Sequence, residues 1–455
     1  MAGVTLLTGL AGKYAAPVPR YTSYPTAPHF VSAEGDEGTY RSWLSALTND
    51  DRLSLYFHIP FCDRLCWFCG CHTKQTLRYD PIAAYLERLI REIDMVADAM
   101  PDARHVTSIH FGGGSPSMLN PEDVMRIFAK IWARFDLASD AEISLEIDPS
   151  DLTEDKLKAW VAAGLTRASI GVQDFDEDVQ AAINRPQSFE LTRDVVEMLR
   201  AAGVRSLNLD VLYGLPLQTE SKIADTIDKV ISLAPDRIAL FGYAHVPWMK
   251  THQRMINEDD LPGVEDRFAQ AQLAAVKLVD AGFERIGLDH FAQPEDSMAR
   301  ALRAGELRRN FQGYTDDSAN ALIGFGASSI GETSLGYSQN LAATPQYLEA
   351  IDAGHLPVGK FYALTDEDRA RKRVIEKLMC ELALPSEFLK NDPSGFGSGL
   401  LAEAAQLAQK DEDGFFKVDA EGYHVTETGR PFVRVLAAHF DAYLNAGKAR
   451  HSVAV

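Results

Sequence analysis

Residues 58–72 read HIPFCDRLCWFCGCH and hold four of the chain's five cysteines within ten positions. They come directly after a short apolar and aromatic run, residues 53–58, whose composition predicts a β-strand. Thiolates are the usual ligands of iron–sulfur clusters and of structural zinc. Four cysteines on one loop after a strand therefore favour a metal centre over buried thiols without a ligand.

The spacing of Cys62, Cys66 and Cys69 is CxxxCxxC. A structural zinc site normally pairs one CxxC with a second pair more than about ten residues away. No second pair exists, because the only other cysteine, Cys380, lies in a predicted amphipathic helix. Zinc held by the four neighbouring cysteines stays an alternative. Three ligands to a four-iron cluster leave one iron open to bind and act on a substrate.

Outward from this loop, short apolar runs alternate with long amphipathic stretches. Predicted strands are residues 53–58, 108–111, 142–147, 167–172, 206–212, 238–243 and 284–288, and predicted helices include 79–100, 121–135, 154–163 and 191–202. A strand every 30–50 residues followed by a helix indicates βα units on a parallel sheet. Six or more units favour an α/β fold of the barrel or partial-barrel type, with the site at the carboxyl ends of the strands.

The two ends of the chain depart from this rhythm. Residues 1–46 form an irregular arm rich in Pro, Tyr and Thr, and its Tyr21, Tyr24 and Phe30 predict packing on the body. We expect the barrel over 47–300, a connecting segment over 301–359, to which family resemblance assigns substrate and cofactor contacts, and a mostly helical domain over 360–455. In that last domain we expect an apolar helix around 375–382, a hairpin over 415–426 and a final helix over 431–444.

Charge limits the partners. The net charge is −20, which disfavours nucleic acid and anionic membranes. Helices with a hairpin suggest a winged-helix domain that binds nucleic acid, but residues 361–455 carry 12 Lys and Arg against 15 Asp and Glu, which favours a packing domain.

The first residues make a poor signal peptide, no apolar run reaches the ~20 residues of a membrane span, and the odd cysteine count fits a reducing compartment. We expect a cytoplasmic protein, and a monomer.

The CxxxCxxC loop after the first strand resembles that of the radical S-adenosylmethionine (SAM) superfamily. Further segments are similar to one of its families, the oxygen-independent coproporphyrinogen III oxidases: RYTSYPTAPHF, YFHIPFCDRLCWFCGC, HFGGGSPS, EISLEIDP, SIGVQDFD with INR, LNLDVLYGLP and NFQGYT. The resemblance covers nearly the whole chain and implies a partial (β/α) TIM-like barrel. The fourth cysteine, Cys71, is its most discriminating feature.

The resemblance implies roles by position. Cys62, Cys66 and Cys69 would hold a [4Fe–4S] cluster, and Cys71 and Tyr56 would take part in catalysis. One SAM would be held by Tyr56, Gly113, Glu146 and Ile330, and a second by Phe68, Gly114, Ser115, Gln173, Arg185, Asp210 and Ala244. The family usually has Thr at the position of Ser115 and Tyr at that of Trp67, and Ser115 keeps the hydroxyl.

Each of these positions also has a plainer interpretation. Residues 112–114 are three glycines after a strand, which suit a close backbone approach to a ligand or a mere tight turn. Glu146 and Asp210 fit hydrogen-bond acceptors for a ligand or structural salt bridges. Gln173 fits a turn and Arg185 a helix cap. Tyr56 alternates with Leu55 and Phe57, so it also fits the hydrophobic core.

The implied reaction is oxidative decarboxylation of two propionates of coproporphyrinogen III to vinyl groups, which gives protoporphyrinogen IX. No ordinary side-chain base removes a proton from such a carbon, so a cofactor must do the hard step. One SAM per propionate, a flavodoxin-like or ferredoxin-like electron donor and an unidentified electron acceptor are expected. The substrate carries four carboxylates, and Arg20 and Arg434 are the predicted basic partners.

Two other functions compete with this one. A haem carrier or chaperone of the same superfamily would bind haem without turnover, and Cys71 and the RYTSYPT arm argue against it. A zinc-stapled interaction protein would contain zinc and no iron.

Overall fold

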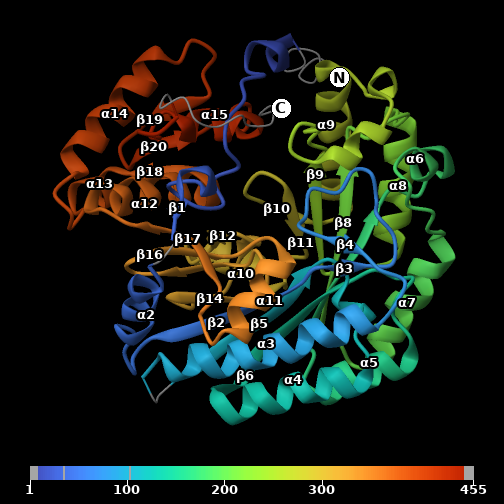
Figure 1. Cartoon of the computed structure of the whole chain (residues 1–455). Coiled ribbons are helices and arrows are strands. Elements are labelled where there is room, and N and C mark those ends of the chain that lie inside the picture. The colour runs from blue at the N-terminus through green and yellow to red at the C-terminus, as the bar shows by residue number, and fades with distance from the viewer. Residues whose placement is uncertain (1–8, 34–35, 102–103, 445–455) are drawn as a thin grey trace.

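The computed structural model describes residues 9–33, 36–101 and 104–444. Its centre is a 13-stranded sheet with the order β1-β17-β16-β15-β14-β2-β5-β6-β7-β8-β9-β11-β10 (Figure 1). The strands from β2 to β9 are parallel neighbours in chain order: β2 (Arg52–Ile59), β5 (His105–Gly113), β6 (Asp136–Ile147), β7 (Arg167–Gln173), β8 (Ser206–Tyr213) and β9 (Arg237–Gly242). The strand order does not close on itself, so the predicted partial barrel is confirmed.

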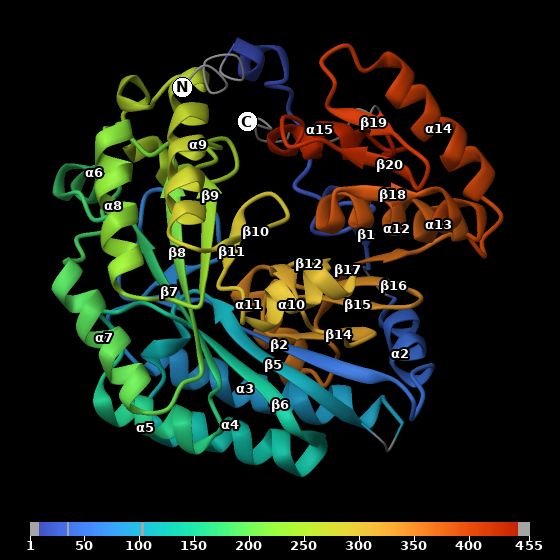
Figure 2. The same ribbon diagram turned by 180° about the vertical axis from the view of Figure 1, so that it is seen from behind.

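Helices cover the outer face of these strands (Figures 1 and 2). They are α3 (Asp80–Asp98), α4 (Pro121–Arg134), α5 (Glu154–Ala162), α6 (Glu177–Ala182), α7 (Phe189–Ala201), α8 (Glu220–Ser232) and α9 (Val264–Asp280). Alternation along β2 explains the layering, because Leu55 and Phe57 are fully buried toward the helices while Tyr56 between them is not. Phe57 stacks between Phe111 and Phe325 at 4.7 and 4.8 Å, which aligns three strands.

The sequence-based expectation for residues 284–288 is wrong. Instead of a further parallel strand, the chain forms an antiparallel hairpin of β10 (Glu284–Ile286) and β11 (His290–Ala292), and β11 pairs with β9. The turn begins at Gly287, whose φ of +55° suits glycine. The ring of Tyr314 lies where a side chain at Gly287 would project, and its hydroxyl accepts from the backbone N–H of Leu288 at 3.0 Å. The predicted parallel series therefore ends at β9.

Residues 301–359 contribute more than a connection. β14 (Ala321–Phe325) runs parallel to β2 on its other side, and the antiparallel strands β15 (Ile330–Thr333), β16 (Gly336–Asn340), β17 (Val358–Ala363) and β1 (Val31–Ser32) extend the sheet. Also here are α10 (Ser297–Ala304), the ribbon β12 (Arg308–Asn310) with β13 (Gly313–Thr315), and α11 (Thr344–Asp352). β14 thus places residues of the segment over 301–359 beside β2.

The C-terminal region has its own small sheet, β18 (Ala383–Pro385), β19 (Phe416–Val418) and β20 (Gly422–Val425), with α12 (Asp366–Glu381), α13 (Ser386–Lys390) and α14 (Gly397–Lys410). The predicted apolar helix and hairpin are confirmed. The predicted final helix is too long, since α15 spans only Val433–Ala438 after a 3-10 turn over Arg430–Phe432. Turns follow, and Tyr443 there donates its hydroxyl to Asp368 at 2.7 Å.

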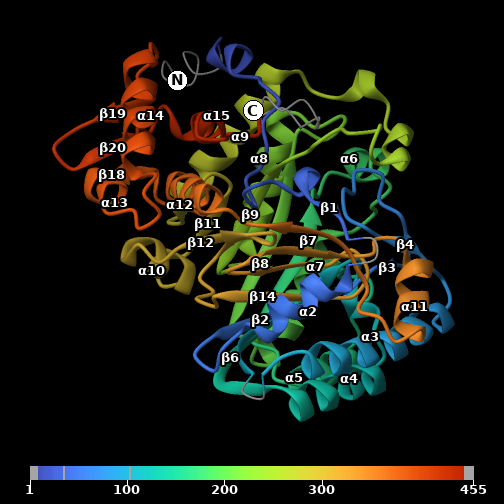
Figure 3. The ribbon, with the colours of Figure 1, turned by 60° about the vertical axis from the view of Figure 1, so that its left-hand side comes forward.

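The N-terminal arm packs as expected. Tyr21, Tyr24 and Phe30 are 4%, 1% and 5% exposed, and the arm shares a hydrophobic core with the C-terminal domain, beside which it runs in Figure 3. Arg434 in α15 donates to the carbonyls of Val18 and Pro19. The short helix α2 (Glu37–Ser45) then leads into the barrel. Among the described residues, no helix is long and apolar enough to cross a bilayer.

Candidate metal centre

The cysteine loop leaves β2 and is closed by a two-residue ladder, β3 (Phe61–Cys62) with β4 (Lys74–Gln75). Its backbone carbonyls are held by side chains from distant segments. Lys250 donates to the carbonyl of Cys71 at 2.9 Å, His252 to that of Cys69 at 2.7 Å, and Gln253 to that of Phe68 at 2.9 Å. Asn184 donates to the carbonyl of Leu65 at 2.9 Å. The backbone is therefore fixed without using the sulfur atoms.

None of the three CxxxCxxC thiols forms a disulfide, and Cys62 interacts electrostatically with Cys66 and Cys69. Burial raises the pKa of the Cys62 thiol, and Cys69 and Cys66 raise it further. Two donors point at sulfur: Arg185 donates to Sγ of Cys66 and the N–H of Cys71 to Sγ of Cys69, both at 3.4 Å. Such donors stabilise thiolates that hold a metal.

This donor set fits a [4Fe–4S] cluster better than a single ion. Within the described ranges, no three His, Cys, Asp or Glu side chains converge on one metal position. A tetrahedral zinc site needs such convergence, whereas each thiolate of a four-iron cluster binds a different iron.

Next to the loop, His58 connects it to Tyr56. The Nε2 of His58 lies 2.9 Å from the carbonyl of His72, and Nδ1 lies 3.0 Å from the hydroxyl of Tyr56. A carbonyl only accepts, so Nε2 donates and Nδ1 accepts from Tyr56. Burial lowers the pKa of His58 to about 4, which keeps the ring neutral as this pattern requires. Tyr56 is therefore oriented on the face of β2 opposite to Leu55 and Phe57, where it is half-buried.

Glu146 ends the next polar group. Its carboxylate accepts from the backbone N–H of Gly113 at 2.9 Å and from Nε2 of His110 at 3.2 Å, and His110 stacks on Tyr56 at 5.7 Å. Although burial opposes it, these donors hold the pKa of Glu146 below its ordinary value. The side chain is still 41% exposed, so a charged carboxylate remains accessible to a ligand amine.

Gly112–Gly114 are required by close approaches, not only by a turn. A side chain at Gly112 would lie 2.7 Å from the Glu146 carboxylate, and one at Gly114 would lie 2.5 Å from the carbonyl of Phe61. Gly113 has a φ of +106° and lies against the His58 ring. The glycines thus let β5 touch both the acidic group and the cysteine loop.

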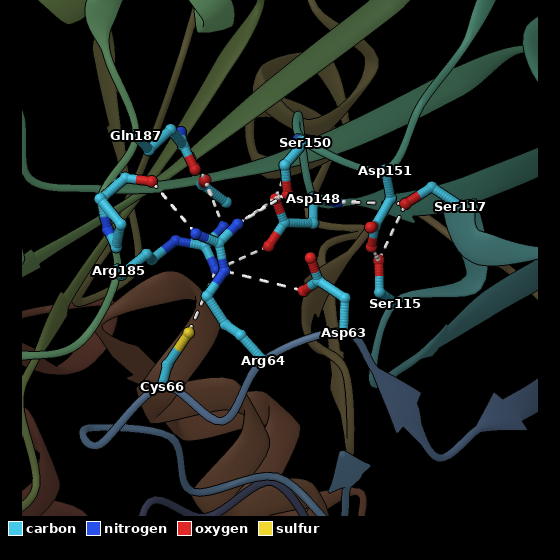
Figure 4. Close-up of polar contacts among 12 residues, drawn as sticks. Asp63, Arg64, Cys66, Ser115, Ser117, Asp148, Ser150, Asp151, Arg185 and Gln187 are labelled. Atoms are coloured by element: carbon cyan, nitrogen blue, oxygen red, sulfur yellow. Dashed lines mark hydrogen bonds and ion pairs between the residues drawn. The ribbon is translucent and has the colours of Figure 1, made fainter. Parts of the chain in front are cut away.

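A second polar group surrounds Arg185 (Figure 4). Besides Cys66, its guanidinium donates to Asp148 at 2.9 Å and to the carbonyl of Gly171 at 2.9 Å, so it does not cap a helix. Arg185 also counteracts burial and holds the pKa of Asp148 below its ordinary value. Gln173 lies at the same strand end with a φ of +67°, a left-handed conformation that is costly for this residue and typical of functional sites.

The remaining predicted positions lie around the same strand ends. Ser115 donates to Asp151 at 2.5 Å (Figure 4). Asp210 accepts from Asn208 at 2.7 Å and Ser169 at 3.1 Å, and burial together with Glu146 raises its pKa to about 6. No Lys or Arg within the described chain pairs with Glu146 or Asp210, and the ion-pair partner of Glu146 there is His110 at 3.2 Å.

Ile330, Phe68 and Ala244 complete the group. Ile330 in β15 lies against Gly324, which is the β14 partner of Tyr56. One amide, that of Gln253, donates to the carbonyls of both Phe68 and Ala244. The structure thus brings together predicted residues from the cysteine loop, from β2, β5, β6, β7, β8 and β15, and from the segments that follow β5, α6 and β9.

Sequence reasoning missed several residues of this region. His58 follows Tyr56 by two positions, which places both on one face of a strand and was a usable signal. Asp148 follows β6 in the same way. Lys250, His252 and Gln253 gave no local signal, because their partners lie in the cysteine loop far away in sequence.

Arg20 and Arg434 do not contact the cysteine loop. Both line a separate cavity of about 280 Å³ at the ends of β8 and β9, which Ala244 also lines. Arg20 is exposed and donates to the carbonyl of Gly242 at 3.1 Å, whereas Arg434 is buried.

Comparison with known proteins agrees with this geometry. The model of the radical SAM superfamily matches residues 56–230. The chain is 45% identical to the oxygen-independent coproporphyrinogen III oxidase of Paracoccus denitrificans, over 98% of both proteins, and 48% identical to that of Bradyrhizobium diazoefficiens, over 96% of this chain and 97% of the other. The solved structure of coproporphyrinogen III oxidase (HemN) from Escherichia coli, a radical SAM enzyme, superimposes with a TM-score of 0.88 at 38% identity, over 93% of this chain and 98% of the other.

Proposed function

The chain belongs to the family of oxygen-independent coproporphyrinogen III oxidases, and on that premise we propose which of its residues carry out the reaction. It is a radical SAM oxidoreductase of haem biosynthesis that uses a [4Fe–4S] cluster and SAM. The relatives are named as oxidases, which disfavours the haem carrier. When bound, cluster and SAM together supply the 5′-deoxyadenosyl radical that removes hydrogen from the substrate carbon.

Cys62, Cys66 and Cys69 hold the cluster. The observation that carries this assignment is the loop itself, whose carbonyls are bound by Lys250, His252 and other side chains while its thiols form no disulfide. Because the backbone is fixed, the loop presents three sulfur atoms in one arrangement before iron arrives.

The polar residues around Glu146 hold the first SAM. Glu146 accepts hydrogen bonds from its amino group, Gly113 and Ile330 bound the ligand closely, and Tyr56, oriented by His58, fixes its position. Support for this comes from the open carboxylate of Glu146 and from the glycines that let backbone approach it.

The residues around Arg185 hold the second SAM. They are Phe68, Gly114, Ser115, Gln173, Arg185, Asp210 and Ala244. The buried guanidinium of Arg185 and the half-buried carboxyl group of Asp210 suit a zwitterionic ligand with a ribose. Cys71 lies exposed at the edge of the loop and acts on the substrate. One SAM is consumed per propionate, so two serve each coproporphyrinogen III.

The setting of the reaction completes the proposal. The enzyme works as a cytoplasmic monomer, receives electrons from a flavodoxin-like or ferredoxin-like protein, and passes electrons from the substrate to an acceptor of unassigned identity. We divide the chain into four regions: the arm over 1–46, the barrel over 47–300, the connecting segment over 301–359 and the domain over 360–455. The packed arm helps to exclude water and oxygen from the site.

The test is an anaerobic assay of protein reconstituted with iron and sulfide, supplied with dithionite, SAM, coproporphyrinogen III and cell extract as a source of acceptor. We expect 5′-deoxyadenosine and protoporphyrinogen IX from the wild type and neither from Cys62→Ser. Fewer than two methionines per protoporphyrinogen IX would reject one SAM per propionate. 5′-Deoxyadenosine without any change in coproporphyrinogen would reject the substrate.

A further inference from the structure

Six arginines line the cavity at the ends of β8 and β9, although the chain as a whole carries a net charge of −20. They come from the arm, α9, the β10–β11 hairpin, β12 and the last turns of the C-terminal domain: Arg20, Arg267, Arg285, Arg309, Arg430 and Arg434. The one carboxylate in the lining is Asp289. We call this cavity the arginine pocket.

The contacts of these arginines orient them without neutralising them. Arg267 donates to the carbonyl of Tyr243 at 2.7 Å, and Arg309 to the carbonyl of Arg20 at 3.0 Å. Among Arg20, Arg267, Arg285, Arg309 and Arg430, only Arg430 has an Asp or Glu oxygen of the described residues within 4 Å, that of Glu427 at 3.4 Å. Backbone carbonyls fix the direction of a guanidinium but carry no countercharge.

Three of the arginines have buried N–H groups that no atom of the described residues accepts. Arg309 is only 7% exposed, and its Nε and Nη1 have no hydrogen-bond partner there. The Nε atoms of Arg267 and Arg430 are also buried without a partner. A buried donor left unpaired is costly, and a buried charge more so, which indicates that an anionic partner completes the site.

The arginines also repel one another. Burial and the neighbouring Arg20 lower the pKa of Arg434 to about 10, and burial and Arg430 lower the pKa of Arg285. Asp289 offsets part of this charge, but it is itself paired with His290 at 2.8 Å. An excess of positive charge thus remains in a partly enclosed cavity.

The walls of the arginine pocket suit an apolar body. Tyr213, Phe241, Tyr243, Trp248, Phe268 and Phe291 line it beside the arginines. Ala244, also in the lining, is joined to the cysteine loop, because Gln253 donates to the carbonyls of both Ala244 and Phe68. A ligand that is aromatic in its centre and anionic at its edge fits such a cavity next to the metal centre.

We propose that the arginine pocket binds the propionates of coproporphyrinogen III that the reaction leaves intact, with Arg267 and Arg309 as the principal carboxylate partners. This inference rests on the proposed function. Guanidinium groups stabilise a carboxylate and so oppose its loss as neutral carbon dioxide. They therefore belong with the two propionates that are retained, which leaves the two reactive propionates directed toward the cysteine loop.

The experiment compares Arg309→Gln, Arg267→Gln and Arg285→Gln in reconstituted holoenzyme. Arg303→Gln is the matched control, since Arg303 is exposed in α10 and donates to Glu284 and to the carbonyl of Pro294. The readouts are KM for coproporphyrinogen III, binding of the fluorescent oxidised probe coproporphyrin III, binding of its tetramethyl ester, iron content and SAM affinity.

Arg309→Gln and Arg267→Gln should each raise KM and weaken probe binding about tenfold to a hundredfold, as expected for a hydrogen bond to a charged group. Iron content, SAM affinity and binding of the uncharged ester should stay unchanged, and Arg303→Gln should match the wild type. The guanidinium of Arg285 lies 6.0 Å from the centre of the Phe291 ring. Because this contact is weak, Arg285→Gln is expected to fold even if the variants of the buried arginines do not. It should weaken probe binding at least threefold, roughly the loss of one solvent-accessible charge contact.

Probe binding within twofold of the wild type in every folded arginine variant would overturn the inference while leaving the oxidase activity untouched. The opposite failure is also distinguishable. If the wild type formed no protoporphyrinogen IX but still bound the probe in an arginine-dependent way, the proposed function would fall and the anion pocket would remain.

Discussion

Arg185 donates a hydrogen bond to the sulfur of Cys66 at 3.4 Å, and the same guanidinium nitrogen donates to Asp148 at 2.9 Å. A cationic donor at a cluster sulfur favours the reduced, more negative state of the cluster. Arg185→Met should therefore lower the midpoint potential, by about 60 mV for a tenfold change in a one-electron equilibrium. A redox titration followed by electron paramagnetic resonance measures this.

Arg64→Met is the control for that change. Arg64 also donates a hydrogen bond to Asp148, at 3.5 Å. Its other hydrogen bonds within the described chain go to the hydroxyl of Ser150 and the carbonyl of Pro186, and none goes to a sulfur (Figure 4). The midpoint potential of the cluster in Arg64→Met should stay within about 15 mV of that in the wild type. Equal shifts in the two variants would mean that the ion pair, not the bond to sulfur, sets the potential.

The five cysteines should separate into three classes. Cys62→Ser, Cys66→Ser and Cys69→Ser should lose the cluster's iron and visible absorption, because a three-thiolate site has no spare ligand. Cys71→Ser should keep iron but lose protoporphyrinogen formation. Cys380→Ser is the control, since this thiol is buried in α12 within another hydrophobic cluster. Zinc in place of iron in the wild type would refute the assignment.

Gly112→Ala tests the position of Glu146. The added methyl would lie 2.7 Å from the Glu146 carboxylate, so that carboxylate must move. We expect SAM affinity to fall about tenfold while iron content is kept, as a small misplacement of a binding group commonly costs this much or more. Gly399→Ala, at a position with nothing within 4 Å, should behave as the wild type. Unchanged SAM affinity in Gly112→Ala would remove Glu146 from the SAM site.

Glu92 predicts a pH dependence of stability. It is buried in α3 and accepts from Tyr347 at 2.7 Å, Gly326 at 2.8 Å and Asn340 at 2.6 Å. Burial raises its pKa from 4.5 to about 7. Between these values the folded protein holds a proton that the unfolded chain has lost, so this contribution is full below pH 4.5 and is lost as pH rises through 7.

The expected size is on the order of 3 kcal/mol of unfolding free energy. Thermal unfolding at pH 5.5 and pH 8 should show the loss in the wild type and a much smaller difference in Glu92→Gln, which cannot ionise. Its amide is expected to lower stability at both pH values, because one of its N–H groups faces the amide of Asn340. A pH difference as large in Glu92→Gln as in the wild type would assign it to another group.

Sequence reasoning located the parallel strands because each has a run of apolar residues long enough to be buried on a helix-covered face. It missed the parallel strand β14, whose five residues include Gly324 and which pairs with the distant β2. It also missed β15, β16 and β17, which are short, contain Gly and polar residues, and pair antiparallel at the end of the sheet. It found the cysteine loop from local spacing alone.

The arginine pocket shows the same limit at the level of a site. The four carboxylates of the substrate lead to the prediction of Arg20 and Arg434 as its basic partners. The structure places both arginines in the lining of one cavity, together with Arg267 and Arg309. The latter two had no distinguishing neighbours in the sequence. Their significance comes from burial without an ion pair to the described residues, which depends on how the arm, α9, β12 and α15 meet.

The hydrogen bonds from Arg434 to Val18 and Pro19 join the two ends of the chain. The ribosome makes Val18 416 residues and Pro19 415 residues before Arg434. Since domains fold as units while synthesis proceeds, the barrel and its cysteine loop are complete before the outer wall of the arginine pocket exists. The nascent protein therefore passes through a stage in which the metal-binding loop is formed and the substrate cavity is still open to its surroundings.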